Sequence, residues 1–337
     1  MCPADVRLSI KIILRKSLMK KVLALTAAML CMMAGQSHAG WWSNYWNYAK
    51  TENPIMLVPG IFAFDTIAIV DYWYQIPNAI EYRGGEVYVA EINAFDSSVG
   101  RGEELIEQLE EIKAASNGRI KKFNLIGHSQ GGMTSRYVME TRPDLVASVS
   151  TSHTPHTGTP IADLVSSVAP PSTIRGTAFG VFANAVGDIV NLLSGANRSN
   201  SDVFAMLSEF NSQGSTNFNS TYTNGLPSSS CGNGPSQVNI DGNNIKLYSW
   251  SGVGQFTNIA DISDPLFGIT SLAFSSGDRN DGITGECSSH FGTVIRDDYF
   301  MNHIDANNQI FGLTSLFETD PKTLFRNHAN RLKNAGL

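Results

Sequence analysis

The stretch Asn124-Leu125-Ile126-Gly127-His128-Ser129-Gln130-Gly131-Gly132 decides the fold of this chain. An apolar run ends in Gly-x-Ser-x-Gly and then continues into helix-forming residues. This pattern is typical of a nucleophile elbow, a strand-to-helix turn so tight that its serine takes strained backbone angles and projects its hydroxyl from the sheet. A Cβ at Gly127 or Gly131 would collide with neighbouring backbone. A turn whose serine only caps a helix does not explain glycines on both sides.

Short apolar runs alternate with helical patterns along the chain, which favours an α/β fold with a mainly parallel central sheet flanked by helices. Met133–Thr141 continues the elbow as a helix, and Glu103–Ala114 has apolar residues at helical spacing. The predicted core strands are Ile55–Val58, Val87–Glu91, Phe123–Ile126, Val146–Thr151 and Leu247–Trp250.

Turn and cap signals place two later elements. Asp241-Gly242 predicts a β-hairpin between Gln237–Ile240 and Ile245–Ser249. Asp320 is a good N-cap and Pro321 a good first residue for the closing helix.

Residues 1–39 have the form of a signal peptide. Met19-Lys20-Lys21 begins a charged region, Val22–Met33 is apolar, and Ser37-His38-Ala39 fits a cleavage site. The apolar core is too short for a stable membrane anchor. Met19 is a candidate for the true start.

Cleavage after Ala39 leaves 298 of the 337 residues, enough for a single large domain over residues 40–337. This part has 18 basic and 29 acidic residues, a net charge of −11. Such a charge argues against nucleic acid and against electrostatic attraction to anionic membranes. Any contact with lipid must be hydrophobic.

Cys231 and Cys287 are the cysteines that remain after the leader. In an exported protein an isolated pair is most simply one disulfide, and two buried thiols are the alternative. A bridge here would close a loop of about 56 residues and stabilise the fold by about 4 kcal/mol in the chain-entropy model.

Thr177–Leu193 is almost uncharged, with Asp188 as its ionisable residue, and the following Ser194–Pro235 is rich in Ser, Gly and Asn. An apolar helix between flexible polar loops is either part of the ordinary core or a mobile lid. The lid insertion would span about residues 160–220. Exposing its large side chains to water would cost about 1.5–3 kcal/mol each. A lid of this kind would open where a lipid surface receives those groups.

A serine hydroxyl needs a base to remove its proton, and the base needs a carboxylate to orient it. After an elbow of this type the acid precedes the histidine in the chain. This order leaves His290 and His303 as bases, with the acid best placed in Asn280-Asp281-Gly282. His303 is favoured, because the Phe291–Ile295 segment can bring it to Asp281. The histidines set aside are His128, inside the elbow, His153 and His156, before any suitable acid, and His328, in the terminal helix.

The tetrahedral intermediate of acyl transfer carries an oxyanion that needs preorganised N–H donors, each worth about 3–4 kcal/mol. Gln130, directly after the serine, supplies one backbone N–H. The second is expected from the loop after the first core strand, where Pro59 has no N–H and Gly60 lets the chain turn, so that Ile61 is the expected donor. Viewed alone, the loop could equally be a Pro-Gly turn that ends a strand.

Asp305 follows His303 too closely to reach the far nitrogen of its ring. It lies among oxygen-rich residues, with Asp261 and Asp264 upstream. Calcium binds carboxylates and backbone carbonyls in flexible geometry, so these residues suggest a cation site. Solvated Asp and Asn residues on a loop would look the same in the sequence.

Motifs over nearly all of the mature chain match those of one family. They are Val70-Asp71-Tyr72-Trp73, Gly127–Gly132, Tyr248-Ser249-Trp250-Ser251-Gly252, Asn280-Asp281-Gly282, Cys287-Ser288-Ser289-His290, Met301-Asn302-His303-Ile304-Asp305, Phe311–Pro321 and His328–Leu337. By these motifs the chain resembles the secreted triacylglycerol lipases of Gram-negative bacteria, the Pseudomonas/Burkholderia type, which have the α/β-hydrolase fold. Departures occur at Pro59, where relatives usually have His, and at Ile61, where Met or Leu is common.

The resemblance implies a serine hydrolase that cleaves triacylglycerols at oil–water interfaces. The alternative is a broader carboxylesterase or polyester depolymerase. A pseudoenzyme would be expected to lack a triad member, and none is missing. The implied site residues are the triad Ser129, Asp281 and His303, the oxyanion donors Ile61 and Gln130, the Cys231–Cys287 disulfide and a lid at Thr177–Leu193.

The resemblance also implies a structural calcium ion that pins the loop bearing His303. Its ligands would be the carboxylates of Asp261 and Asp305 and the backbone carbonyls of Gln309 and Leu313, with Asp264 as the competing upstream ligand. Many members of the family need a dedicated membrane-anchored foldase. They leave the cell through the periplasm by type II secretion.

Overall fold

The computed structural model describes residues 45–61, 71–166, 180 and 206–337. The chain divides into a unit of residues 1–48 and a unit of residues 49–337, which holds the core. The centre of the larger unit is a seven-stranded sheet in the order β2-β1-β3-β4-β6-β5, with β7 also paired to β6. Strand β5 is antiparallel to β6, and the other described pairings are parallel. The predicted α/β fold with a mainly parallel sheet is confirmed.

All five core strands predicted from apolar runs are present. Strands β1, β3 and β4 are buried along their whole length, as expected for parallel strands covered on both faces. Strand β7 was not predicted, because its sequence TVIRDDY is largely polar and most of its residues are only partly buried. The strands are β1 Ile55–Val58, β2 Val87–Val89, β3 Phe123–His128, β4 Val146–Ser152, β5 Gln237–Ile240, β6 Asn243–Gly252 and β7 Thr293–Tyr299.

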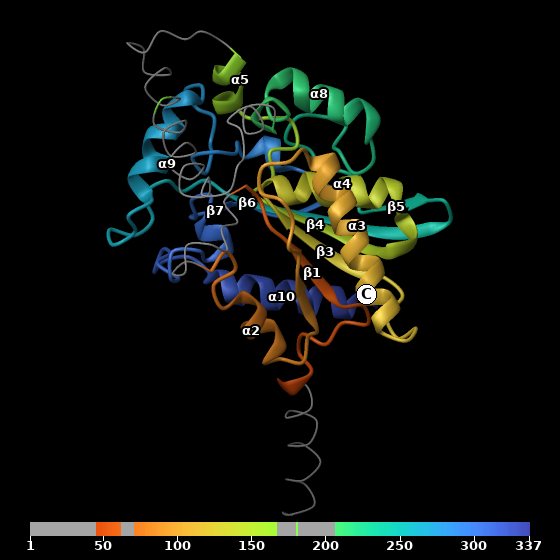
Figure 1. Cartoon of the computed structure of the whole chain (residues 1–337). Helices are drawn as coiled ribbons and strands as arrows, with labels where there is room; N and C mark the ends of the chain where they lie inside the picture. Colours follow the sequence, from red (N-terminus) through yellow and green to blue (C-terminus); the bar gives the residue numbers. More distant parts are fainter. Residues whose placement is uncertain (1–44, 62–70, 167–179, 181–205) are drawn as a thin grey trace, which may run out of the picture. The chain divides into compact units, whose positions relative to one another are not determined.

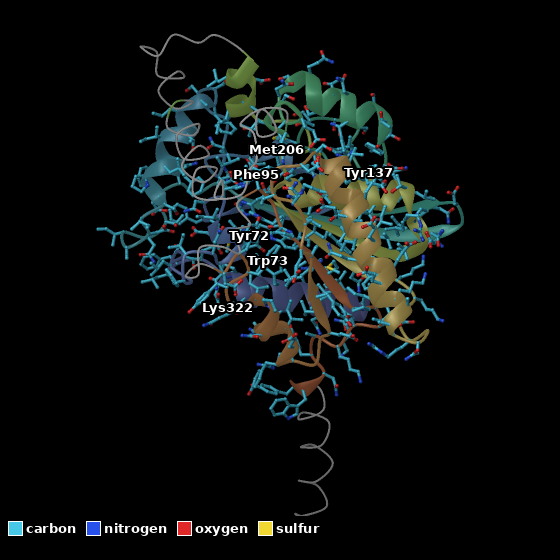
Figure 2. The ribbon with its side chains drawn as sticks, viewed as in Figure 1. Tyr72, Trp73, Phe95, Tyr137, Met206 and Lys322 are labelled. Atoms are coloured by element: carbon cyan, nitrogen blue, oxygen red, sulfur yellow. A yellow bond between two sulfur atoms is a disulfide. The ribbon has the colours of Figure 1, made fainter. Side chains whose placement is uncertain are left out.

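Helices cover the sheet. Figure 1 shows α3 and α4 together over one face, while α2 and α10 lie side by side across the other. In Figure 2, Trp73 lies in the interior beside Tyr72. Its indole packs edge-on against the ring of Phe325 in α10, with the ring centroids 5.5 Å apart. The described α-helices are α2 Ile76–Glu81, α3 Ser98–Ala115, α4 Gln130–Thr141, α5 Pro160–Ser166, α8 Ser212–Thr221, α9 Asp264–Thr270 and α10 Pro321–Asn334.

The predicted turn and cap residues act as expected. Asp241 and Gly242 join β5 to β6 with φ angles of 49° and 81°, the left-handed pair that a tight hairpin turn requires. The side chain of Asp320 accepts a hydrogen bond from the backbone N–H of Lys322 and so caps α10.

The interpretation of Ser194–Pro235 as flexible polar loops was wrong for part of the segment. Helix α8 lies within it, although its sequence SQGSTNFNST is poor in strong helix formers. The Asn211 side chain caps this helix at Gly214 N, and the side chains of Ser215 and Phe218 form its buried face. Tertiary packing therefore overrides propensity here. The proposed lid Thr177–Leu193 lies outside the described residues except for Gly180, and the signal peptide lies wholly outside them. Among the described residues, no helix has the length and apolar character to cross a membrane.

Candidate active site

The turn between β3 and α4 has the strained geometry predicted for a nucleophile elbow. Ser129 adopts φ 56° and ψ −128°, angles that are rare for a residue with a side chain. A Cβ on Gly127 would lie 2.2 Å from the Gly131 carbonyl oxygen, and one on Gly131 would lie 2.0 Å from the Val58 carbonyl oxygen. Both glycines are therefore required by direct contact with backbone.

Ser129, His303 and Asp281 form one continuous line of hydrogen bonds. Ser129 Oγ lies 2.9 Å from His303 Nε2, and His303 Nδ1 lies 2.9 Å from Asp281 Oδ2. The side chains of His303 and Asp281 are fully buried, and Ser129 is 5% exposed. The structure thus brings together the three residues that the sequence predicts as a triad, from positions up to 174 residues apart.

Sheet topology explains why these residues meet. Ser129 directly follows β3, and His303 comes shortly after β7. Because the carboxyl ends of parallel strands lie at one edge of the sheet, their following loops converge there. The loop that contains Asp281 arrives at the same edge, held by hydrogen bonds of its backbone to His303 N and Thr284 O.

The Asp281 carboxylate receives four hydrogen bonds. Its Oδ1 accepts from the backbone N–H groups of Ile283 and Thr284, at 2.9 and 2.6 Å. Its Oδ2 accepts from the rings of both His303 and His153, at 2.9 and 2.6 Å. Burial alone would raise the pKa of Asp281, but the charge interaction with His303 and the two imidazole hydrogen bonds reverse this and hold it below its usual value. The acid is ionised at neutral pH.

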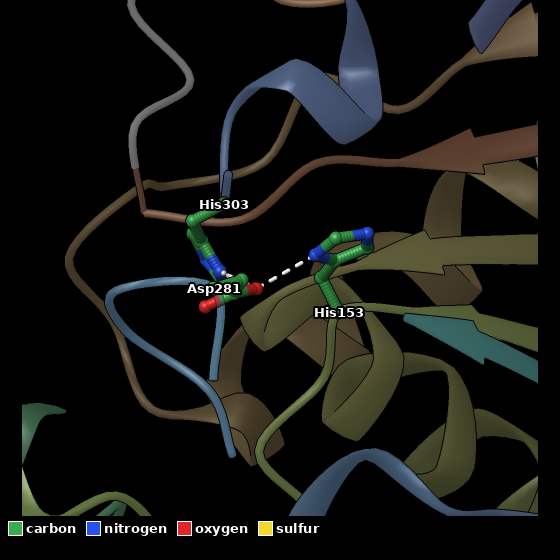
Figure 3. A group of neighbouring side chains, drawn as sticks. All are labelled: His153, Asp281 and His303. Atoms are coloured by element: carbon green, nitrogen blue, oxygen red, sulfur yellow. Dashed lines mark hydrogen bonds and ion pairs between the residues drawn. The ribbon is translucent and has the colours of Figure 1, made fainter. Parts of the chain in front are cut away.

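His153 is a site residue that the sequence reasoning missed. It was set aside because it precedes the acid in the chain, yet its ring meets the same carboxylate oxygen as the ring of His303 (Figure 3). His153, Asp281 and His303 place potential metal-ligating atoms within 4.8 Å of one another. A signal was available, since His153 directly follows β4, whose carboxyl end lies beside that of β3. His290, the other candidate base, lies apart from this group and binds Asp297 and the Gly232 carbonyl.

His128, within the elbow, turns away from the Ser129 hydroxyl as predicted. Its Nδ1 lies 2.6 Å from the Tyr72 hydroxyl, and its Nε2 lies 2.8 Å from the His303 carbonyl oxygen. Burial, together with the charges of His303 and His153, holds its pKa well below 6.5. Its ring is therefore neutral at pH 7. Tyr72 was recognised only as part of a family motif, and its hydroxyl also accepts a hydrogen bond from Gly60 N at 2.7 Å.

The loop after β1 approaches the nucleophile closely. A Cβ on Gly60 would lie 2.7 Å from Ser129 Cβ, so only glycine fits at this point. The fully buried Arg101 donates to the Pro59 carbonyl, and to the Asn93 carbonyl at 2.6 Å. Ile61 and Gln130, the two predicted oxyanion donors, both border a cavity at Ser129.

This cavity has a volume of about 30 Å³ and mostly apolar walls. Apolar side chains beside the serine hydroxyl match the chemistry of an acyl-binding site, and the volume corresponds to a small group next to the serine. Besides Ile61, Ser129 and Gln130, the cavity is bordered by Ile161, Ala162, Leu207, Phe210 and Ile283, with Pro155 and Thr159.

The three aspartates considered for a cation are all buried, with exposures of 4% for Asp261, 4% for Asp264 and 2% for Asp305. Both oxygens of Asp264 are occupied by protein donors, since Oδ2 accepts from two backbone N–H groups and Oδ1 from the Asn302 amide. Asp261 differs, because its Oδ1 is bound by Ser263 while its buried Oδ2 has no hydrogen-bond partner.

The negative charges of these three carboxylates repel one another. Burial raises the pKa of Asp305 to about 7; hydrogen bonds from Thr257 and Asn302 lower it, and the nearby charges of Asp261 and Asp264 raise it. Burial likewise raises the pKa of Asp261. Buried carboxylates with an unpaired oxygen fit a hard cation, which would supply the missing charge and ligand. The geometry favours Asp261 over Asp264 as the upstream ligand.

The Cys231–Cys287 disulfide is present and links two segments 56 residues apart. It joins the loop before β5 to the short 3-10 helix Cys287–Ser289. Ser288, in that helix, donates through its hydroxyl to the Gly158 carbonyl at 2.7 Å. The bridge therefore supports the loops that surround the triad.

Comparison with known proteins agrees with this geometry. The α/β hydrolase fold family matches residues 53–306. The chain is 47% identical over 291 residues to the triacylglycerol lipase of Vibrio cholerae, covering 86% of this chain and 90% of that one. It is 36% identical over 323 residues to the triacylglycerol lipase of Burkholderia plantarii, covering 86% and 88%. The crystal structure of Staphylococcus hyicus lipase superposes with a TM-score of 0.54 at 16% identity, covering 85% of this chain and 97% of that one, and so shares the fold. The chain belongs to the bacterial triacylglycerol lipases, a family of the α/β-hydrolase fold.

Proposed function

We propose that this chain hydrolyses the carboxylic ester bonds of triacylglycerols through an acyl-enzyme formed on Ser129. The observation that carries the proposal is the continuous hydrogen-bond line from Ser129 Oγ through His303 to the buried carboxylate of Asp281. An apolar cavity at the serine and relatives named triacylglycerol lipase support the substrate class.

In the first half of the reaction, His303 Nε2 accepts the proton of Ser129 as its oxygen attacks the acyl carbonyl. Asp281 holds the His303 ring in the tautomer that leaves Nε2 free to accept. His303 then returns the proton to the departing glyceride oxygen, and the acyl group stays on Ser129. In the second half, His303 Nε2 takes a proton from water as the water oxygen attacks the acyl carbonyl. His303 then returns that proton to Ser129 Oγ as the acyl–serine bond breaks and the fatty acid leaves.

The oxyanion of each tetrahedral intermediate is assigned to the backbone N–H groups of Ile61 and Gln130. Both residues border the cavity at Ser129. Gln130 also begins α4, where the positive end of the helix dipole favours negative charge. The Gln130 side chain is engaged elsewhere, because its Nε2 donates to the Asp96 carbonyl at 2.8 Å. Arg101 and Gly60 fix the path of the loop that presents Ile61.

The test of this proposal is Ser129→Ala, measured on emulsified long-chain triglyceride and on a soluble ester. Turnover should fall by about 10⁶ in kcat if the triad acts as a unit, as it does in the serine protease from which that figure comes. Labelling by a fluorophosphonate should disappear in parallel. A folded Ser129→Ala variant that still hydrolyses ester at the parent rate would disprove the assignment.

A chain-length profile separates this function from the broader alternatives. A triacylglycerol lipase should prefer long-chain emulsions, whereas a general carboxylesterase or polyester depolymerase should prefer short soluble or polymeric esters. The proposed lid within about residues 160–220 adds a second readout. Rates should rise sharply when a soluble ester passes into emulsion, and smooth saturation across that point would argue against lid gating.

A structural calcium ion is proposed at Asp261 and Asp305, with backbone carbonyls from Gln309 and Leu313. The unpartnered Oδ2 of Asp261 and the raised pKa of Asp305 support this site. The ion would bind Asp305, two residues after His303, and so supply a fixed positive charge to the loop that bears His303. The proposed role of the ion is to hold His303 in place. The atoms that react lie on Ser129, His303 and the substrate.

Export is proposed from the leader at residues 1–39 and from the disulfide, since disulfides persist in oxidising compartments. The mature chain would then act outside the cell after passing through the periplasm. A dedicated foldase is the proposed partner. Expression with and without a candidate foldase, followed by the emulsion assay, tests both the partner and the secreted activity.

A further inference from the structure

His153 occupies a costly backbone conformation at the end of β4. Its φ angle is +50°, a left-handed value that is unfavourable for a residue with a side chain. Both sides of its backbone are held, since its N–H donates to the Trp250 carbonyl at 3.0 Å and its own carbonyl accepts from Thr284 Oγ1 at 3.0 Å. The neighbouring structure therefore imposes this conformation firmly.

The ring of His153 makes one polar contact. Its Nδ1 lies 2.6 Å from Asp281 Oδ2, and its side chain is 0% exposed. Because the Asp281 carboxylate is ionised and can only accept, Nδ1 carries the proton. The other ring nitrogen, Nε2, is buried with no hydrogen-bond partner.

A purely structural role explains these features poorly. An unpaired polar atom in the interior lowers the stability of the fold, and the strained φ angle adds to that cost. An apolar residue at this position would avoid the unpaired polar atom, and a glycine would avoid both that atom and the backbone strain. The one favourable polar interaction of the side chain is directed at the carboxylate that orients the catalytic base.

The position of that contact is specific. The two donors on Asp281 Oδ1 come from Ile283 and Thr284, in the same turn as the aspartate, and would move with it. His153 approaches from a different strand and meets Oδ2, the oxygen that His303 uses (Figure 3). His153 therefore holds the Asp281 carboxylate from outside the turn that contains Asp281, while His303 bonds to the same oxygen.

We propose that His153 is a positioning residue for the triad, which ties the Asp281 carboxylate to the end of β4 so that Oδ2 stays in place to face His303. The proposal rests on the triad proposed above. No atom of His153 touches substrate in this role, and its effect reaches the reaction through Asp281 and His303. Loss of the His153 contact leaves the carboxylate held by donors of its own turn and by His303, so that the turn can shift relative to β4 and the base is less well oriented.

The test compares His153→Gly with His153→Asn. Glycine accepts the +50° φ angle without strain and removes the ring. Asparagine tolerates left-handed φ and places a side-chain N–H₂ near the position of Nδ1. On a soluble p-nitrophenyl ester, with active sites counted by fluorophosphonate, His153→Gly should lower kcat by about 10- to 100-fold, as expected for misplacement of a reacting group. KM should change by less than about twofold, and His153→Asn should recover most of kcat.

A double-mutant comparison separates positioning through Asp281 from a general loss of structure. In an Asp281→Asn background, adding His153→Gly should lower kcat no further. A further loss there, an unchanged kcat in His153→Gly, or equal losses in the Gly and Asn variants would overturn the proposal. If Ser129→Ala abolishes turnover while His153→Gly keeps it, the triad stands and only this inference fails. If Ser129→Ala keeps turnover, the proposed function fails first.

Discussion

The His128 ring lies against the backbone of His303, with its Nε2 2.8 Å from the His303 carbonyl oxygen. A carbonyl can only accept, so Nε2 carries the proton of the neutral ring. Its Nδ1 is then an acceptor, and the Tyr72 hydroxyl, 2.6 Å away, donates to it. Tyr72 in turn accepts from Gly60 N. One chain of directed hydrogen bonds thus connects the loop after β1, the elbow and the loop that bears His303.

Tyr72→Phe should break this chain at its centre. The substitution leaves the Gly60 N–H and the His128 Nδ1 buried without partners, which should lower the free energy of unfolding by about 2–3 kcal/mol. Because the chain also orients the proposed oxyanion loop, kcat should fall while fluorophosphonate still labels Ser129. Urea unfolding and steady-state kinetics measure the two effects.

The matched control is Tyr88→Phe. The Tyr88 hydroxyl donates to Glu86 at 2.7 Å on a partly exposed strand, so its loss should change stability by less than about 0.5 kcal/mol. Equal stability of Tyr72→Phe and the parent protein would show that the chain contributes nothing.

Arg101→Lys should loosen the loop that presents Ile61. Burial lowers the pKa of Arg101 to about 10, so it remains charged at neutral pH. Its planar fork reaches the Asn93 and Pro59 carbonyls at once, which the single ammonium of lysine cannot do in the same geometry. We expect a loss of about 2–4 kcal/mol in unfolding free energy, in the range for broken buried polar networks, and about a tenfold lower kcat.

Arg119→Lys provides the comparison for this result. Arg119 pairs with Glu86 at the surface, and its side chain is 60% exposed, so the change should leave the unfolding free energy nearly unchanged. If both substitutions have the same small effect, Arg101 does not support the loop.

Several site features were predictable because they depend on short stretches of sequence. The two glycines around Ser129 are fixed by contacts within the elbow and with β1, and the strained angles of the serine follow from them. The pairing of Asp281 with His303 followed from chain order. Helix α10 was predictable from its Asp320 cap and its Pro321 start.

Other features depend on contacts that no local pattern reveals. His153 and Asp281 are 128 residues apart, and Tyr72 and His128 are 56 apart. Chain order identifies the base of a triad, but it does not identify further donors to the acid. Strand β7 lacks a clear apolar run and forms because β6 offers it a parallel edge at Tyr248–Gly252. Such elements become predictable only once the order of strands in the sheet is known.

Calcium removal should act on stability. If Asp261 and Asp305 hold the ion, calcium at about 100 times its dissociation constant stabilises the fold by about 2.7 kcal/mol. For a domain of nearly 300 residues that corresponds to about 4–5 °C in melting temperature. Scanning calorimetry with calcium and with a chelator should show this shift in the parent protein and none in Asp261→Asn. The exposed Asp278→Asn should keep the full shift. A parent protein whose melting temperature is the same with calcium and with a chelator would contradict the site.

Mild acid should destabilise the fold through its buried neutral histidines. The ring of His328 is fully buried between Ser150 Oγ at 2.7 Å and Arg331 Nη1 at 3.0 Å. Burial, reinforced by the Arg331 charge, holds its pKa well below 6.5, and burial has the same effect on the pKa of His128 and of His156. Below pH 6.5 the unfolded chain binds protons at these rings that the folded chain does not. Stability therefore falls as pH decreases from about 6.5, by up to about 4 kcal/mol per pH unit for three such groups.

His328→Gln tests the contribution of one ring. Glutamine cannot titrate, so the unfolding free energy of this variant should fall less steeply between pH 6.5 and 5.5 than that of the parent, by about 1.4 kcal/mol per pH unit. Urea unfolding at pH 5.5, 6.5, 7.5 and 8.5 measures both slopes. Between pH 7.5 and 8.5 the unfolded histidine is already neutral, so the two proteins should show the same slope there whatever the cost of the substitution itself. Identical slopes below pH 6.5 would mean that His328 takes up its proton in the folded state, against the effect of its burial and of Arg331.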